Sequence, residues 1–130
     1  MSIEKETFRS GPFKKFMAQG TRVGNALYLS GQVGLDASGK PGADITEQTK
    51  LAYQNIRDVL SEFGATMDNV VDETFFVTDM SEAMSNAEAV FSVREAAYGG
   101  KPEVSQTMVQ IGALVMPELK VEIKCVAHLE

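Results

Sequence analysis

The side chains that most often carry out chemistry are scarce in this sequence. It contains one histidine, His128, and one cysteine, Cys125. His128 lies almost at the end of the chain, so we expect no Ser-His-Asp triad within one copy. One histidine and one cysteine also cannot supply a histidine-rich metal site or an internal disulfide. We expect Cys125 to lie on the apolar side of a strand and to pack as a small hydrophobic group. Any catalysis must be carried out by carboxylates, amides, hydroxyls or main-chain groups, with neither a metal nor a cofactor.

Length and composition restrict the class of protein further. The chain has 130 residues, of which 44% are apolar, which predicts one domain over residues 1–130 with its own hydrophobic core. The longest uncharged apolar runs fall short of the roughly 20 residues that a spanning helix needs. The N-terminal residues lack the features of a secretory signal or a transit peptide. We therefore expect a cytoplasmic protein without a membrane-bound role.

The charge balance indicates whether the protein can bind nucleic acid. Eighteen acidic residues against 12 basic ones give a net charge of -6, and the basic residues are scattered apart from the pair Lys14-Lys15. Non-specific affinity for nucleic acid depends on clustered lysines and arginines. No nucleic-acid partner is expected.

Hydrophobic periodicity predicts two helices, each with one apolar face. Asp44 and Glu47 have the spacing of a capping box, and the helix that they open is expected to end at Gly64. Ser81 is expected to cap the second helix, which ends at Gly99.

Strands are expected at 26–33, 70–78, 104–111 and 119–127, with short extended pieces before them. Ser30-Gly31 interrupts the strand at 26–33, as glycines do at a bulge or at a close approach of another group. The order of the elements predicts an α+β fold, a mixed sheet with both helices packed on one face.

The other face of the sheet has mixed polarity. In 119–127 the residues alternate between an apolar and a charged side, whereas neither side of 104–111 is wholly apolar. The face without helices is either wetted or an oligomer interface with a cleft. It is expected to carry Gln106, Met108, Gln110, Lys120 and Glu122.

The run from Gly24 to Gly34, Gly-Asn-Ala-Leu-Tyr-Leu-Ser-Gly-Gln-Val-Gly, resembles the G-N-x-x-x-x-S-G-Q segment of the Rid (YjgF) family of reactive-intermediate deaminases. The segments 48–57, 76–79 and 117–124 follow in the order of that family, so the resemblance covers nearly the whole chain. It implies a chorismate-mutase-like α+β fold. It also implies a homotrimer whose sheets form a central barrel, with a small-molecule cleft between neighbouring subunits.

In active members of the family, the cleft hydrolyses enamines and imines such as 2-aminoacrylate to a keto acid and ammonia. The resemblance places Ser30 and Gly31 at the turn whose main-chain groups position water and the imine. Glu122 matches the glutamate of the last strand, which acts as acid, base or water-orienting group. From alternation alone, Glu122 is an ordinary ion-pairing position between two lysines, and Ser30-Gly31 is a bulge.

The family's arginine, which holds the substrate carboxylate, has no counterpart here. Its position falls on Gln106, and an alternative register offers Ser105 or Thr107. Gln106 is either a substrate-binding amide or a hydrogen-bonded interface amide. Arg22 or Arg94 of a neighbouring subunit is an open alternative source of the missing charge.

Other positions imply a less polar pocket than in the active members. Met17, or Phe16, lies where they often carry a tyrosine, and Met108 lies where they often carry a cysteine. Phe13, Met17 and Met108 are expected to form the apolar wall. Three hypotheses follow: a weak or altered imine or enamine hydrolase; a metabolite-binding trimer without catalysis; and a ribonuclease or translation inhibitor, which the acidic balance disfavours.

Overall fold

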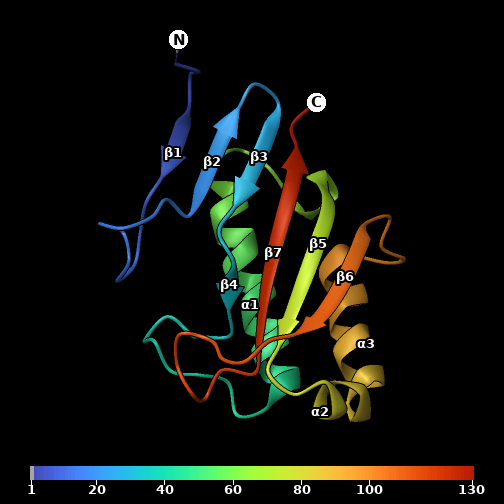
Figure 1. Cartoon of the computed structure of the whole chain (residues 1–130). Helices are drawn as coiled ribbons and strands as arrows, with labels where there is room; N and C mark the ends of the chain where they lie inside the picture. The colour runs from blue at the N-terminus through green and yellow to red at the C-terminus, as the bar shows by residue number, and fades with distance from the viewer. Residues whose placement is uncertain (1) are drawn as a thin grey trace.

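The computed structural model describes residues 2–130, whose strands form one mixed sheet (Figure 1). The strand order is β1-β2-β3-β7-β5-β6, and the short β4 also pairs with β7. All neighbouring strands are antiparallel except β5 and β6, which are parallel. The strands are β1 (Glu6–Phe8), β2 (Gly20–Val23), β3 (Ala26–Leu29), β4 (Gln32–Val33), β5 (Val70–Val77), β6 (Ser105–Gln110) and β7 (Val121–His128).

The helices cover one face of this sheet, and the hydrophobic core lies between the two layers (Figure 1). Val121, Ile123, Cys125 and Ala127 of β7 are all buried on the helix side, as their alternation predicts. The α+β fold with a mixed sheet is therefore confirmed. The helical elements are α1 (Ile45–Ser61), the 3-10 turn η1 (Met67–Asn69), α2 (Met80–Ser85) and α3 (Ala87–Tyr98).

Helix α1 begins as the sequence predicts. The Asp44 carboxylate accepts a hydrogen bond from the Glu47 backbone amide at 2.8 Å, which satisfies one of the free amides of the first turn. The chain turns away at Gly64, where φ is +70°. Within residues 2–130, no helix is both long and apolar enough to cross a membrane.

The prediction for the second helical region is wrong in two respects. Asp79, rather than Ser81, is the N-cap of α2, and its carboxylate accepts from the Glu82 amide at 3.0 Å. This aspartate, two residues after the end of β5, caps the helix before the chain reaches Ser81. Asn86, at φ -109° and ψ 15°, then separates α2 from α3. The expected single helix is thus two helices, and the region 2–130 contains three α-helices rather than two.

The predicted orientation of β6 is also wrong. In the parallel register, Gln106 pairs with Glu73 and Met108 pairs with Phe75, and both of these β5 residues are completely buried on the helix side. Gln106 and Met108 therefore face the helices, and so does Gln110, whose side chain accepts from the Met80 amide at 2.8 Å. Polar side chains are tolerated on this side because buried or main-chain groups bind them.

Candidate functional site

The sheet face without helices carries the predicted glutamate near its centre. Glu122 of β7 lies between Val33 of β4 and Phe76 of β5 in the strand register. Ser105 and Thr107 of β6 lie on this same face, because they alternate with the helix-facing Gln106 and Met108. We call this surface of β3, β4, β7, β5 and β6 the open face.

Gly31 and Glu122 are in direct contact although 91 positions separate them in the chain. A Cβ built on Gly31 would overlap the Oε2 atom of Glu122 and would lie 2.8 Å from its Cγ. Any larger residue at position 31 would displace the carboxylate. The break between β3 and β4 therefore seats the Glu122 side chain against bare backbone, as glycines do where another group approaches closely.

The electrostatic setting of Glu122 favours proton transfer. Partial burial raises the pKa of its carboxyl above the ordinary value of 4.5, and the Lys124 ammonium acts in the opposite direction. Within the described part of the chain, no side chain or amide donates a hydrogen bond to this carboxylate. Its oxygens are thus free for water or a ligand, and its pKa is moved toward the range of a working acid or base.

Ser30 holds the main chain next to this contact. Its hydroxyl donates to the Ala18 carbonyl at 2.6 Å, and its amide donates to the Gln19 carbonyl at 2.9 Å. Both groups are used to bind the segment that follows the turn at 11–17. Ser30 is therefore suited to positioning the main chain rather than to attacking a substrate, since no base accompanies its hydroxyl.

Phe13 and Met17 lie on the turn at 11–17, and both are exposed, at 40% and 44%. The turn is closed by the Phe16 and Met17 amides, which both donate to the Phe13 carbonyl, at 2.8 and 3.0 Å. The structure thus brings Ser30, Gly31 and Glu122 together and leaves Phe13 and Met17 on an adjoining exposed turn. Gln106 and Met108 lie on the other side of the sheet, so they cannot line a site at Glu122.

The register with Ser105 and Thr107 on the open face is the one that the geometry supports, and neither residue is cationic. The Ser105 hydroxyl donates to Asp72 Oδ1 at 2.7 Å. Arg94 forms an ion pair with Glu73 at 2.6 Å on the helix side, and Arg22 donates to the Gly24 carbonyl within its own hairpin. Neither arginine is available to the open face of its own chain.

A buried carboxylate that sequence reasoning missed lies on the helix side of β5, beside β6. Glu73 is completely buried and accepts four hydrogen bonds, from Tyr53 at 2.9 Å, Tyr98 at 2.6 Å, Arg94 at 2.6 Å and Gln106 at 2.7 Å. Burial and the charge of Glu73 raise the pKa of both tyrosines, so they stay protonated donors. The available signal was a glutamate in phase with Phe75 and Val77 on the apolar side of a strand.

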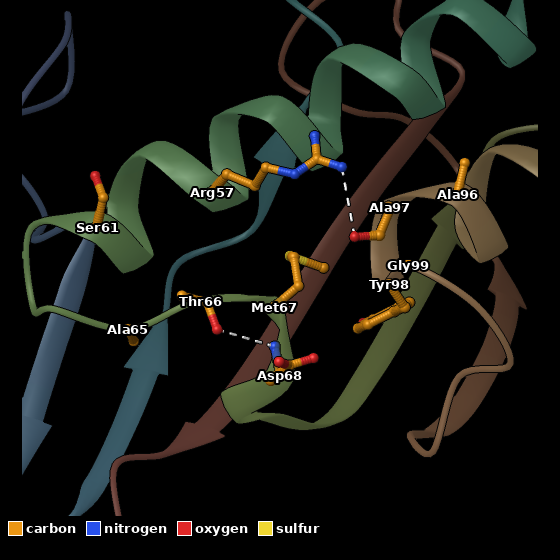
Figure 2. A pocket seen from close by; sticks show the side chains of 10 residues that line it. All are labelled: Arg57, Ser61, Ala65, Thr66, Met67, Asp68, Ala96, Ala97, Tyr98 and Gly99. Carbon is orange, nitrogen blue, oxygen red and sulfur yellow. Dashed lines mark hydrogen bonds between the residues drawn. The ribbon is translucent and has the colours of Figure 1, made fainter.

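The helix side also carries a hollow of about 410 Å³ between α1, α3 and the segment 65–68 (Figure 2). Arg57 reaches across it from α1 and donates to the Ala97 carbonyl at the end of α3, at 3.4 Å. This contact is a cap of the last turn of α3. None of the predicted site residues lines the hollow. Among residues 2–130, no three side chains of the metal-binding types are grouped to hold an ion.

The chain is similar in sequence to known proteins. A family model described as Endoribonuclease L-PSP matches residues 9–129. The chain is 32% identical over 108 residues to the RutC family protein YjgH of Escherichia coli, covering 83% of this chain and 79% of that protein. It is 30% identical over 126 residues to the 2-iminobutanoate/2-iminopropanoate deaminase of Capra hircus, covering 85% and 88%.

The same relationship holds in three dimensions. The crystal structure of a member of the YjgF/YER057c/UK114 family from Mycobacterium tuberculosis matches with a TM-score of 0.81 and 30% identity, over 96% of this chain and 99% of that one. The shared fold agrees with the resemblance of residues 24–34 to the Rid family. The chain therefore belongs to the Endoribonuclease L-PSP family, whose members include the YjgF, RutC and Rid proteins.

Proposed function

We propose that this protein hydrolyses small imines, enamines or closely related metabolites, with Glu122 as the proton-transfer group. The observation that carries the proposal is the Glu122 carboxylate, which lies on the open face against Gly31 with its oxygens unoccupied and its pKa raised by burial. Relatives that share 30% of its residues over most of the chain are named 2-iminobutanoate/2-iminopropanoate deaminases.

The reaction needs orientation and one proton relay. Water adds to the carbon of a protonated imine while the Glu122 carboxylate accepts a proton from that water. The same carboxyl then returns the proton to the nitrogen. As the carbon–nitrogen bond breaks, the Glu122 carboxylate takes the proton of the new hydroxyl group and passes it to the departing ammonia, so that a keto group and ammonium are formed. The balance requires no other reactant. A raised pKa suits the glutamate to both halves of this relay, and main-chain groups at 30–31 would orient the water.

The proposed site includes a cleft formed with other copies of the chain. The open face exposes Tyr28 and Val109, at 49% and 37%, next to the charged Glu122 and Lys124. A homotrimer that packs these faces into a barrel would cover the apolar groups and enclose Glu122 between subunits. Exclusion of bulk water would strengthen the electrostatic interactions at the carboxylate. Native mass spectrometry tests the assembly, and a monomer at micromolar concentration contradicts it.

The activity is tested by supplying imines with an amino-acid oxidase and measuring release of ammonia and keto acid. Wild type is expected to accelerate hydrolysis, and Glu122→Gln is expected to lose at least 100-fold, in line with about 10²- to 10⁴-fold for a general acid or base. Glu118→Gln, an exposed glutamate shortly before β7, is the matched control and should stay active. Circular dichroism verifies that both variants fold.

One outcome would redirect the proposal. If no member of an imine panel is hydrolysed faster with wild type, but small metabolites raise its unfolding temperature, the protein is a metabolite-binding member of the family. That second candidate is favoured by the absence of a cation at Ser105 and Thr107. Ribonuclease activity is not proposed, because the net charge is -6 and Lys14-Lys15 is the one adjacent basic pair.

A further inference from the structure

Lys124 brings a cation to the open face beside the proposed acid-base group. It lies two residues after Glu122 on β7, so both side chains leave the same side of the strand, with Cα atoms about 7 Å apart. In the register, Lys124 pairs with Thr74 of β5. Its Nζ atom donates to the Leu29 carbonyl at 3.0 Å, immediately before the Ser30-Gly31 break. The amine is therefore directed toward the same break as the carboxylate.

The ammonium of Lys124 retains capacity for a ligand. An ammonium has three donors, and the hydrogen bond to the Leu29 carbonyl uses one of them. The ion pairs between residues 2 and 130 are Arg94 with Glu73 and Lys120 with Glu82, so Lys124 belongs to neither. Its effect on the pKa of Glu122 places it within Coulombic range of that carboxylate.

Three other cations on or near the sheet are committed elsewhere. Arg94 is neutralised by Glu73 on the helix side, Arg22 donates within the β2–β3 hairpin, and Lys120 is paired with Glu82 of α2. Of the cations on the strands next to Glu122, Lys124 is thus the one that both shares its face and lacks an acidic partner.

We propose that Lys124 binds the carboxylate of a small ligand and thereby holds the ligand's other end at Glu122. The ligand is a short monocarboxylate, because the anionic and reacting ends must fit between two alternate positions of one strand. A lysine binds as a point charge on a flexible stem, without the planar fork of a guanidinium. Lys124 therefore selects ligands by charge rather than by the bidentate geometry of the carboxylate. The role of Glu122 in this inference rests on the proposed function, whereas the anion site does not.

Isothermal titration with pyruvate and with its neutral amide, pyruvamide, tests the anion site at constant ionic strength. Wild type is expected to bind pyruvate and to discriminate against pyruvamide. Lys124→Met, which keeps the length of the side chain, is expected to weaken pyruvate binding by about 10- to 100-fold, the range for a charged hydrogen bond. Lys124→Arg should retain most of the affinity because it restores the charge. Lys120→Met is the matched control and should bind as wild type does.

The inference is overturned if wild type does not bind pyruvate, if pyruvamide binds equally well, or if Lys124→Met keeps the wild-type affinity. Kinetics separate this result from the proposed function. Loss of the anchor should raise KM more than it lowers kcat, and Glu122→Gln should chiefly lower kcat. Pyruvate binding through Lys124 without any imine hydrolysis would leave the anion site standing and remove the hydrolase. Imine hydrolysis with unchanged KM in Lys124→Met would instead support the hydrolase and remove the anion site.

Discussion

The Glu73 network is expected to dominate the response of this fold to mutation. Glu73 joins β5 to α1, α3 and β6 through four hydrogen bonds, one of which is also an ion pair with Arg94. Glu73→Leu leaves the Arg94 guanidinium and two tyrosine hydroxyls without their acceptor. Removal of one partner of a buried ion pair typically costs about 3 to 5 kcal/mol. Arg94 is itself 14% exposed, which favours the lower half of that range.

The assay is urea unfolding followed by circular dichroism, at one protein concentration so that any assembly contributes equally. A loss of about 3 kcal/mol corresponds to a fall in Tm of roughly 10 °C for a chain of this size. Asp72→Asn is the matched control, because Asp72 is the adjacent carboxylate on the exposed side of β5, and its free energy of unfolding should fall by less than about 1 kcal/mol.

A double-mutant cycle identifies the cause. Arg94→Met alone leaves Glu73 buried without its counter-charge and should also be strongly destabilising. The double variant Glu73→Leu with Arg94→Met should lose much less than the sum of the two single losses. The reasoning is refuted if Glu73→Leu unfolds within about 0.5 kcal/mol of wild type, or if the two losses simply add.

Two further predictions concern the open face. Gly31→Ala should lower imine hydrolysis at least tenfold while the protein stays folded, because the added Cβ displaces the Glu122 carboxylate. The control is Gly39→Ala, where a Cβ meets nothing within 4 Å but φ is +83°; it should cost stability and spare turnover. Equal activity of Gly31→Ala and wild type would contradict the contact. The pKa of Glu122 is raised in the folded state, so folding favours its protonated form. Wild type should therefore lose stability relative to Glu122→Gln as pH rises from about 4.5 through the folded-state pKa. A constant difference between their free energies of unfolding from pH 4 to pH 8 would show that burial does not act on this group.

The elements that could be predicted from the sequence are those with a local signal. The cap of α1 needs only Asp44 and the amide three residues later, and its end needs only a glycine at Gly64, so both lie where the pattern indicates. The apolar and polar sides of β7 separate sharply, and the strand therefore has one possible orientation. The break at Ser30-Gly31 was expected too, whereas its contact with Glu122 is visible only in the tertiary structure.

Local signals failed where two neighbouring residues offered competing solutions. Asp79 and Ser81 are both good N-cap residues, and the end of β5 at Val77 decides that the aspartate comes first. Similarly, a pattern of apolar residues on one face of 80–98 does not reveal that Asn86 divides the helix, because both pieces can share that face.

The orientation of β6 and the set of groups at the site were decided by the tertiary structure. Each side of β6 mixes polar and apolar residues, so no period of two distinguishes its faces. The deciding partner is Glu73, which is distant in sequence and binds Gln106 from the helix side. The sequence by itself thus determined the order of most elements and the family, and it singled out Glu122 as a candidate. Only the fold showed that Gln106 faces the helices and binds Glu73, and that Lys124 shares the open face with Glu122, because these assignments depend on which groups meet across the sheet.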